Sequence, residues 1–136
     1  MKLIPTGSSR EEVYIRRAII VEELSPLIGT SIPCGAFGGK CVEILYNSVD
    51  ETATRASRSY ESTLAAMRLV EALKKSSLIG VDIPKNKQKK KMYFTKIYEL
   101  RATLTNLGEV KIIVGERNNK RMIHYCITKK IKERTE

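Results

Sequence analysis

Apolar residues in the first part of the chain recur every three to four positions, the spacing of an amphipathic helix. This recurrence ends at Leu24, and Pro26 follows it. Ser9 and Glu12 stand three positions apart just before the apolar pattern, which is the arrangement of a capping box. These signals predict a helix over residues 10–24.

A second helical pattern begins after another capping-box sequence, at Ser48 and Glu51, and continues to Gly80, a natural C-terminal cap. A helix of about thirty residues is longer than the usual 11 to 12, so we expect a break where helix propensity is weakest, near residues 57–59. The glycine- and proline-rich stretch 28–40 before it is expected to be a loop. Residues 42–46 fit either a short strand or a turn of helix.

The period of the apolar pattern changes to two after residue 91, which indicates β-strands. Strands are predicted within residues 92–104, over 109–115 and over 122–128. Turn sequences at 106–108 and 117–120 separate them, and the last two strands should form an antiparallel hairpin.

Strict alternation assigns each side chain of this hairpin to one of two faces. The face expected to meet the helices carries Val110, Ile112, Val114, Ile123, Tyr125 and Ile127. The opposite, open face is expected to carry Lys111, Ile113, His124, Cys126 and Thr128.

Together these patterns predict an α+β fold, in which two main N-terminal helices pack on an antiparallel sheet of about four strands ending in a C-terminal β-hairpin. The 136 residues are the length of a single domain. We expect residues 8–80 to be mainly helical, 81–91 to be a basic linker, 92–128 to form the strands and 129–136 to be a frayed tail.

Composition narrows the class of protein further. The chain is 42% hydrophobic, enough for a buried core. It contains neither an apolar stretch of membrane-spanning length nor the apolar segment of a signal peptide, so we expect a cytoplasmic protein without a membrane partner. Three cysteines are too few for a disulfide-stapled secreted domain, so reduced thiols are expected.

The net charge of +10 is the strongest global signal, and +9 of it lies in residues 81–136. Such an uneven distribution favours a polyanionic partner, in the first place nucleic acid. The cations expected to contact phosphates are Lys85, Lys87, Lys89, Lys90, Lys91, Lys96, Arg101 and Arg121. No sequence motif for base readout accompanies them, so little sequence preference is expected.

Neither of two possible cofactor sites in the sequence fits its motif. Residues 35–40 resemble a phosphate-binding loop, but Cys34 stands in place of its first glycine and Cys41 in place of its Ser or Thr. Cys34, Cys41, Cys126 and His124 could form a zinc site, yet their spacing departs from that of structural zinc ligands. The sequence therefore predicts no metal and no cofactor.

The expected position of His124 and Lys111 on the open face suggests a catalytic activity, RNA cleavage, in addition to nucleic-acid binding. RNA cleavage through the 2′-hydroxyl needs a proton acceptor, a cation beside the phosphate and a donor to the leaving oxygen. His124 is the only histidine in the chain. The candidate catalytic residues are Lys111, His124, Arg117 and Thr128, and the alternative is a non-catalytic module that binds nucleic acid or a protein.

Several segments resemble a known family. They are Ile4-Pro5-Thr6-Gly7 with Glu12-Val13, the stretch from Glu51 to Ala65, and the stretch from Gly108 to Thr128. Together with the order of helices followed by a basic sheet, they resemble PBECR-like domains of the barnase, EndoU, colicin and RelE-like superfamily, found in small mobile-element and polyvalent proteins of Bacteroides-type bacteria. The resemblance implies an α+β nuclease-like domain that acts on RNA, or a degenerate, non-catalytic relative. The expected partner is nucleic acid, RNA rather than DNA, and a protein partner or inhibitor is the other expectation.

Overall fold

The computed structural model describes residues 3–84 and 94–129. The helices in this part of the chain are α1 (Arg10–Leu24), α2 (Tyr46–Ala56), α3 (Tyr60–Met67) and α4 (Leu69–Lys75), with short 3-10 turns η1 (Ser25–Leu27) and η2 (Gly35–Phe37). The strands are β1 (Ser31–Pro33), β2 (Cys41–Glu43), β3 (Ser77–Asp82), β4 (Lys96–Leu104), β5 (Gly108–Glu116) and β6 (Met122–Lys129).

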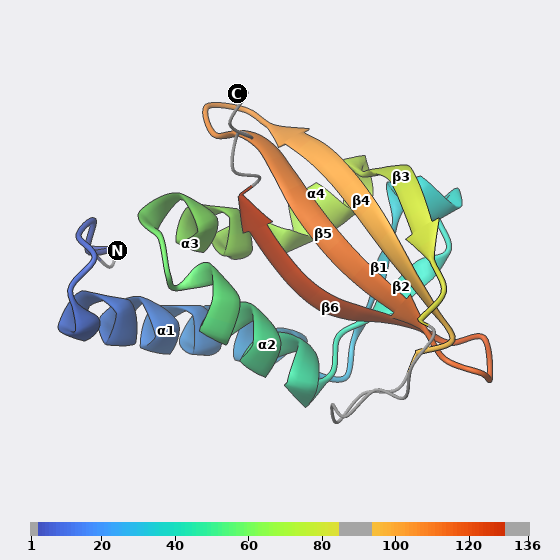
Figure 1. Ribbon diagram of the computed structural model, residues 1–136, viewed down its shortest axis with the longest axis horizontal. Coiled ribbons are helices and arrows are strands. Elements are labelled where there is room, and N and C mark those ends of the chain that lie inside the picture. The colour runs from blue at the N-terminus through green and yellow to red at the C-terminus, as the bar shows by residue number, and fades with distance from the viewer. Residues whose placement is uncertain (1–2, 85–93, 130–136) are drawn as a thin grey trace.

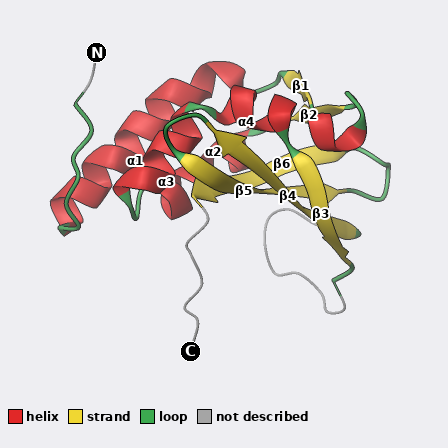
Figure 2. Ribbon diagram, turned by 90° about the horizontal axis from the view of Figure 1, so that it is seen from above, coloured by secondary structure: helices red, strands yellow, loops and turns green. Residues whose placement is uncertain are grey.

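The strands form one sheet in the order β1-β2-β6-β5-β4-β3. All neighbouring strands are antiparallel except β2 and β6, which are parallel. The helices gather on one side of the sheet, as Figures 1 and 2 show. Of these, α2 and α3 contact β6, α4 contacts β4, and α1 packs against α2 and α3.

The α+β class is confirmed, whereas the predicted counts of two main helices and about four strands are too low. The described residues contain four helices and a mixed six-stranded sheet. The first predicted helix matches α1, whose capping box forms as expected: Ser9 accepts a hydrogen bond from the Glu12 backbone, and Glu12 accepts one from the Ser9 backbone.

The second predicted helix is wrong in its extent. It is divided into α2, α3 and α4, and the first break falls near residues 57–59 as expected. Ser59 caps α3 by accepting a hydrogen bond from the backbone of Ser62. Beyond Lys75 the chain enters β3, so Gly80 lies inside a strand and does not cap a helix.

The predicted capping box at Ser48 is also wrong, because α2 already begins at Tyr46. Ser48 instead accepts a hydrogen bond from the Leu45 backbone. The expected loop 28–40 contains β1 and η2. Residues 42–46, which the sequence left open between strand and helix, hold the end of β2 and the start of α2.

The last three strands agree with the sequence prediction in position. The alternating residues Tyr98, Leu100, Ala102 and Leu104 face the helices, with the last three buried. The turn at 106–108 forms with a left-handed backbone at Asn106 (φ 66°) and Gly108 (φ 103°). In the second turn Lys120, rather than an asparagine, adopts the left-handed conformation. The predicted linker is wrong at its start, because Val81 and Asp82 belong to β3. Residues 85–91 of this linker and 130–136 of the predicted tail lie outside the described residues, whereas Lys129 ends β6.

One charged residue lies wholly inside the helical layer. The Arg16 side chain on α1 has no exposed surface. Its Nε donates to the backbone oxygen of Ser57 (2.8 Å), and its Nη1 donates to those of Pro5 (2.8 Å) and Gly7 (2.7 Å). Arg16 therefore ties residues 5–7 and the end of α2 to α1.

Candidate nucleic-acid interface

The side of the sheet away from the helices carries a row of polar side chains from three strands. Arg101 on β4 is the register partner of Lys111 on β5, and Lys111 is the register partner of Thr128 on β6. Register partners in an antiparallel sheet project from the same face. All three side chains are partly exposed. Lys111 and Thr128, two of the predicted catalytic residues, are therefore neighbours on the open face.

His124, the third predicted catalytic residue, is not on that face. A β-bulge between β5 and β6 leaves Tyr125 without a register partner, because Ile113 pairs with Cys126 while Val114 pairs with His124. Because of this extra residue, the side chains of β6 on the N-terminal side of Tyr125 lie on the opposite face from the one that strict alternation predicts. His124 therefore faces the helices beside Val114, and its side chain has no exposed surface.

The bulge also corrects the predicted face of Ile123. Ile127 faces the helices as expected, since it pairs with Ile112. Ile123 was expected there too, but it pairs with Gly115 and belongs to a separate apolar cluster with Phe94 and Tyr125. Tyr125 does contact a helix, because Arg55 on α2 donates to its hydroxyl (3.2 Å). Phe94 and Tyr125 contact each other edge to face, with ring centroids 6.0 Å apart.

Burial changes the acid–base chemistry of His124. Loss of solvation lowers its pKa from 6.5 to about 4, and the Cys126 backbone opposes this shift to a lesser degree. Neither ring nitrogen has a hydrogen-bond partner of ordinary geometry among the described residues. The ring is thus neutral at pH 7, and in this conformation it has no exposed nitrogen with which to take a proton from a substrate.

Arg117, the fourth predicted catalytic residue, lies at the opposite end of the hairpin from Thr128. It follows β5 in the turn before β6. Six residues of extended chain separate it from Lys111, which corresponds to about 20 Å. The structure therefore brings together Lys111 and Thr128 of the predicted set, with Arg101 beside them, and leaves His124 and Arg117 apart.

The predicted phosphate-binding residues in the folded part of the chain are partly engaged by carboxylates. Arg101 forms ion pairs with Glu99 (2.6 Å) and Glu109 (3.6 Å). Arg121 donates through Nε to Glu43 (2.8 Å) and contacts it a second time through Nη2. These contacts lower the pKa of the Glu43 carboxyl, chiefly through the hydrogen bonds from Arg121. Lys96 lies at the start of β4.

Most of the charge excess lies outside the described residues. The described residues contain 16 Lys and Arg against 13 Asp and Glu, whereas the remaining residues contain 9 against 2. Between Asp82 and Glu99 the sequence has six lysines and no acidic residue. Lys85, Lys87, Lys89, Lys90 and Lys91 belong to this stretch and lie outside the described residues.

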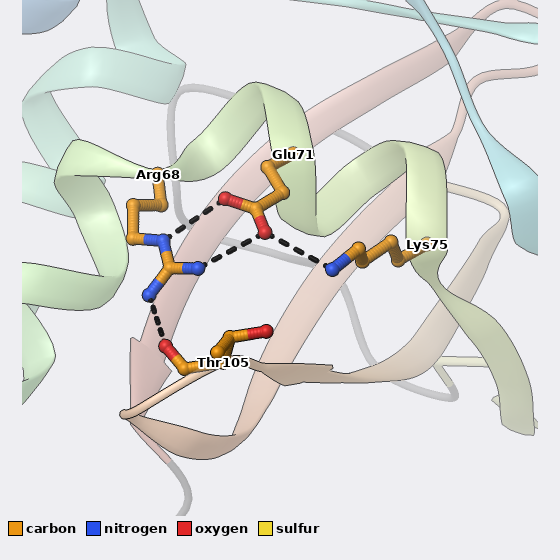
Figure 3. Close-up of polar contacts among 4 residues, drawn as sticks. All are labelled: Arg68, Glu71, Lys75 and Thr105. Atoms are coloured by element: carbon orange, nitrogen blue, oxygen red, sulfur yellow. Dashed lines mark hydrogen bonds and ion pairs between the residues drawn. The ribbon is translucent and has the colours of Figure 1, made fainter.

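Sequence reasoning missed a groove between α1, η1 and α4. Its volume is about 640 Å³, and its lining includes Leu24, Leu27, Met67 and Val70. Arg68 on its rim donates to Glu71 (2.9 and 3.0 Å) and to the Thr105 backbone (2.8 Å), as Figure 3 shows. Lys75 donates to the same carboxylate (3.1 Å).

These bonds, first from Arg68 and then from Lys75, lower the pKa of Glu71 to about 2. The carboxylate is therefore ionised at neutral pH and offsets the two cations. The i,i+3 and i,i+4 spacing of these residues on a helix is the signal that could have predicted the ion pairs, but the groove itself depends on tertiary packing.

The cysteines do not assemble a metal site. Cys34 is buried and lies 3.3 Å from the Ser76 hydroxyl, Cys41 is exposed, and Cys126 is on the face opposite His124. No group of three potential metal-ligating side chains occurs within residues 3–84 and 94–129. Burial raises the pKa of the Cys126 thiol to about 11.

The glycine-rich segment 35–40 has a structural explanation. A side chain at Gly35 would come within 2.5 Å of the Lys74 backbone oxygen, so the residue allows η2 to approach the end of α4. The Cys34 backbone N–H donates to Lys40 (3.0 Å), which closes the segment between β1 and β2.

Within the described part of the chain, no helix has both the length and the apolar character needed to cross a membrane. Comparison with protein-family models, curated proteins and solved structures finds no match to this chain.

Proposed function

We propose that the chain is a basic module that binds nucleic acid, RNA rather than DNA, through phosphate contacts with little sequence preference. The observation that carries this proposal is the stretch between Asp82 and Glu99, which contains six lysines and no acidic residue. Cations that are not neutralised by neighbouring carboxylates supply the counterion-release free energy of nucleic-acid binding. The preference for RNA rests on the family resemblance, and the cytoplasm is the expected compartment.

The open face of the sheet adds a docking surface. Lys111 projects from its centre, beside the Thr128 hydroxyl. An ammonium group and a hydroxyl side by side suit two oxygens of one phosphate. Arg101 is already paired with carboxylates, so Lys111 is the residue of the row that we expect to contribute most to binding.

The test is the salt dependence of RNA binding. Replacing Lys85, Lys87, Lys89, Lys90 and Lys91 by Gln should weaken binding and flatten the slope of log K against log salt, because fewer counterions are released. The matched control replaces the same five lysines by Arg, which keeps the charge and should keep the slope. Undetectable wild-type binding at about 50 mM salt, where such contacts are strong, would refute the proposal.

A second candidate function is metal-independent RNA cleavage on the open face. The observation that favours it is the adjacency of Lys111 and Thr128, a cation and a hydroxyl donor. This activity would need a proton acceptor other than the buried His124. A third role is binding to a protein partner or inhibitor, which is the alternative that the sequence leaves open.

A further inference from the structure

Strand β3 leaves one edge of the sheet open. It is the last strand in the sheet order, and no other strand in the described residues pairs with its outer edge. Three of its side chains are nevertheless apolar and exposed, with relative exposures of 44% for Leu78, 54% for Ile79 and 53% for Val81. Natural edge strands carry charges, Pro or bulges that oppose pairing with another chain. β3 has a bulge after Leu78 and one charge, at its last residue Asp82, but neither Lys nor Pro.

A bulge in β3 gives this edge a self-complementary pattern. Leu78 pairs with Leu100 and Val81 pairs with Tyr98, so both face the helical side of the sheet although they are three residues apart. Ile79 is the extra residue of the bulge, and Gly80 follows it on the open side opposite Glu99. Ser77 and Asp82, at the two ends, also face the open side, because their register partners are Arg101 and Ile97.

We propose that β3 pairs antiparallel with β3 of a second copy of this chain, about a two-fold axis between Ile79 and Gly80. In this register Leu78 lies opposite Val81 of the second copy, on the same face. Ile79 lies opposite the Gly80 position, where the absence of a side chain leaves room for it. The arrangement is isologous, so each contact occurs twice, and the six-stranded sheet continues through both chains.

Charge also favours this occupant and this orientation. A hollow of about 440 Å³ lies beside the start of β3, and its lining includes Lys75, Ser77, Arg101 and Glu109. Arg101 is already paired with Glu99 and Glu109, so Lys75, which pairs with Glu71, is the cation available to a further carboxylate. The two-fold register places Asp82 of the second copy opposite Ser77, beside this lysine. A parallel arrangement would instead set Asp82 beside Asp82 of the second copy, and like charges repel.

The contact is small, because each copy contributes one six-residue strand. Stable protein interfaces commonly bury about 1,200 to 2,000 Å². A dimer formed by one strand pair and six aliphatic side chains, three from each copy, should therefore be weak, and its population should depend on protein concentration.

The experiment is sedimentation velocity of the full chain from low micromolar to several hundred micromolar. We expect the wild type to pass from monomer to dimer. Ile79→Lys and Val81→Lys should keep the chain monomeric throughout, since a lysine on an edge strand opposes pairing. Ile15→Lys is the matched control, because Ile15 is 39% exposed on α1, away from β3. This variant should dimerise as the wild type does.

A charge exchange tests the register. Asp82→Lys and Lys75→Glu should each weaken the dimer, whereas the double variant should restore it, because the two groups meet across the two-fold axis. A wild type that stays monomeric would overturn the proposal. A dimer that persists in the Ile79→Lys variant would also overturn it. The same holds if the wild type forms open-ended assemblies and no closed dimer.

Discussion

His124 lies directly opposite Val114 across the β5–β6 pair, on the helix-covered side of the sheet, with its ring completely buried. The burial lowers its pKa to about 4. In the unfolded chain the same imidazole titrates near pH 6.5. Protons are therefore taken up on unfolding between these two pH values, so the free energy of unfolding should fall as the pH is lowered from about 6.5 to 4.

The first prediction is that replacing His124 by Leu removes this pH dependence. The shift corresponds to roughly 3 kcal/mol of unfolding free energy present above pH 6.5 and lost by pH 4. His124→Leu should also be at least as stable as the wild type near pH 5, because it leaves no unsatisfied nitrogens in the core. Urea unfolding at a series of pH values measures both effects. An identical pH profile in the variant would contradict a buried neutral histidine.

The location of His124 shows where the sequence prediction reached its limit. Strand β6 was predicted at nearly its observed position, because its apolar pattern and flanking turn are local signals. The bulge at Tyr125 reflects pairing with β5, and no local feature of the sequence marks it. A shift of one residue reverses every side chain beyond it, so His124 was assigned to the wrong face although the strand itself was predicted correctly.

The missed strands have a different cause. β1 and β2 contain three residues each, too few for a period to be recognised. β3 follows α4 with a single residue between them, and its exposed aliphatic residues continue the apolar run of the helix. In each case the strand is defined by its neighbours in the sheet, which sequence periodicity does not report.

The second prediction concerns Gly115 on β5. A Cβ atom there would lie 2.3 Å from the ring of Phe94, so the ring packs directly over the glycine backbone. Gly115→Ala should cost roughly 1 to 3 kcal/mol, the usual range for overpacking. In a Phe94→Ala background the same substitution should cost much less, because the clash is removed. Equal costs in the two backgrounds would show that the ring does not occupy this position.

The third prediction is that Arg16 is a structural residue. Arg16→Met leaves three backbone oxygens without their donor, so we expect a loss of roughly 2 to 4 kcal/mol of unfolding free energy. The neighbouring control is Arg17→Ala, which breaks an exposed ion pair with Asp50 (2.8 Å) and should cost less than about 1 kcal/mol. Thermal melts of both variants give the comparison, and similar small losses would refute the assignment.

The fourth prediction concerns the thiols. Cys41 is exposed, whereas Cys34 and Cys126 are buried and burial holds the Cys126 pKa near 11. A thiol reagent at about pH 8 should modify one cysteine rapidly and two only on unfolding, because the thiolate is the reactive form. Cys41→Ser should abolish the rapid phase. Stoichiometric zinc in the purified protein, or a slow reaction of Cys41, would contradict the free-thiol arrangement.

The last prediction separates binding from cleavage on the open face. If the face cuts RNA without metal, the products should carry cyclic or 3′ phosphates, since the 2′-hydroxyl supplies the nucleophile. Lys111→Ala should then lower the cleavage rate by orders of magnitude, because its cation would stabilise the transition-state charge, and leave the melting temperature nearly unchanged.

His124→Gln is the discriminating variant for the acid–base step. General-base catalysis contributes about 10² to 10⁴-fold, so an unchanged rate per folded molecule would exclude His124 and agree with its burial. A rate loss must be compared with the folded fraction, because the substitution alters a core position. Should the wild type bind RNA in a salt-dependent manner and never cut it, Lys111→Ala would still weaken binding, since Lys111 would then act as a phosphate contact alone.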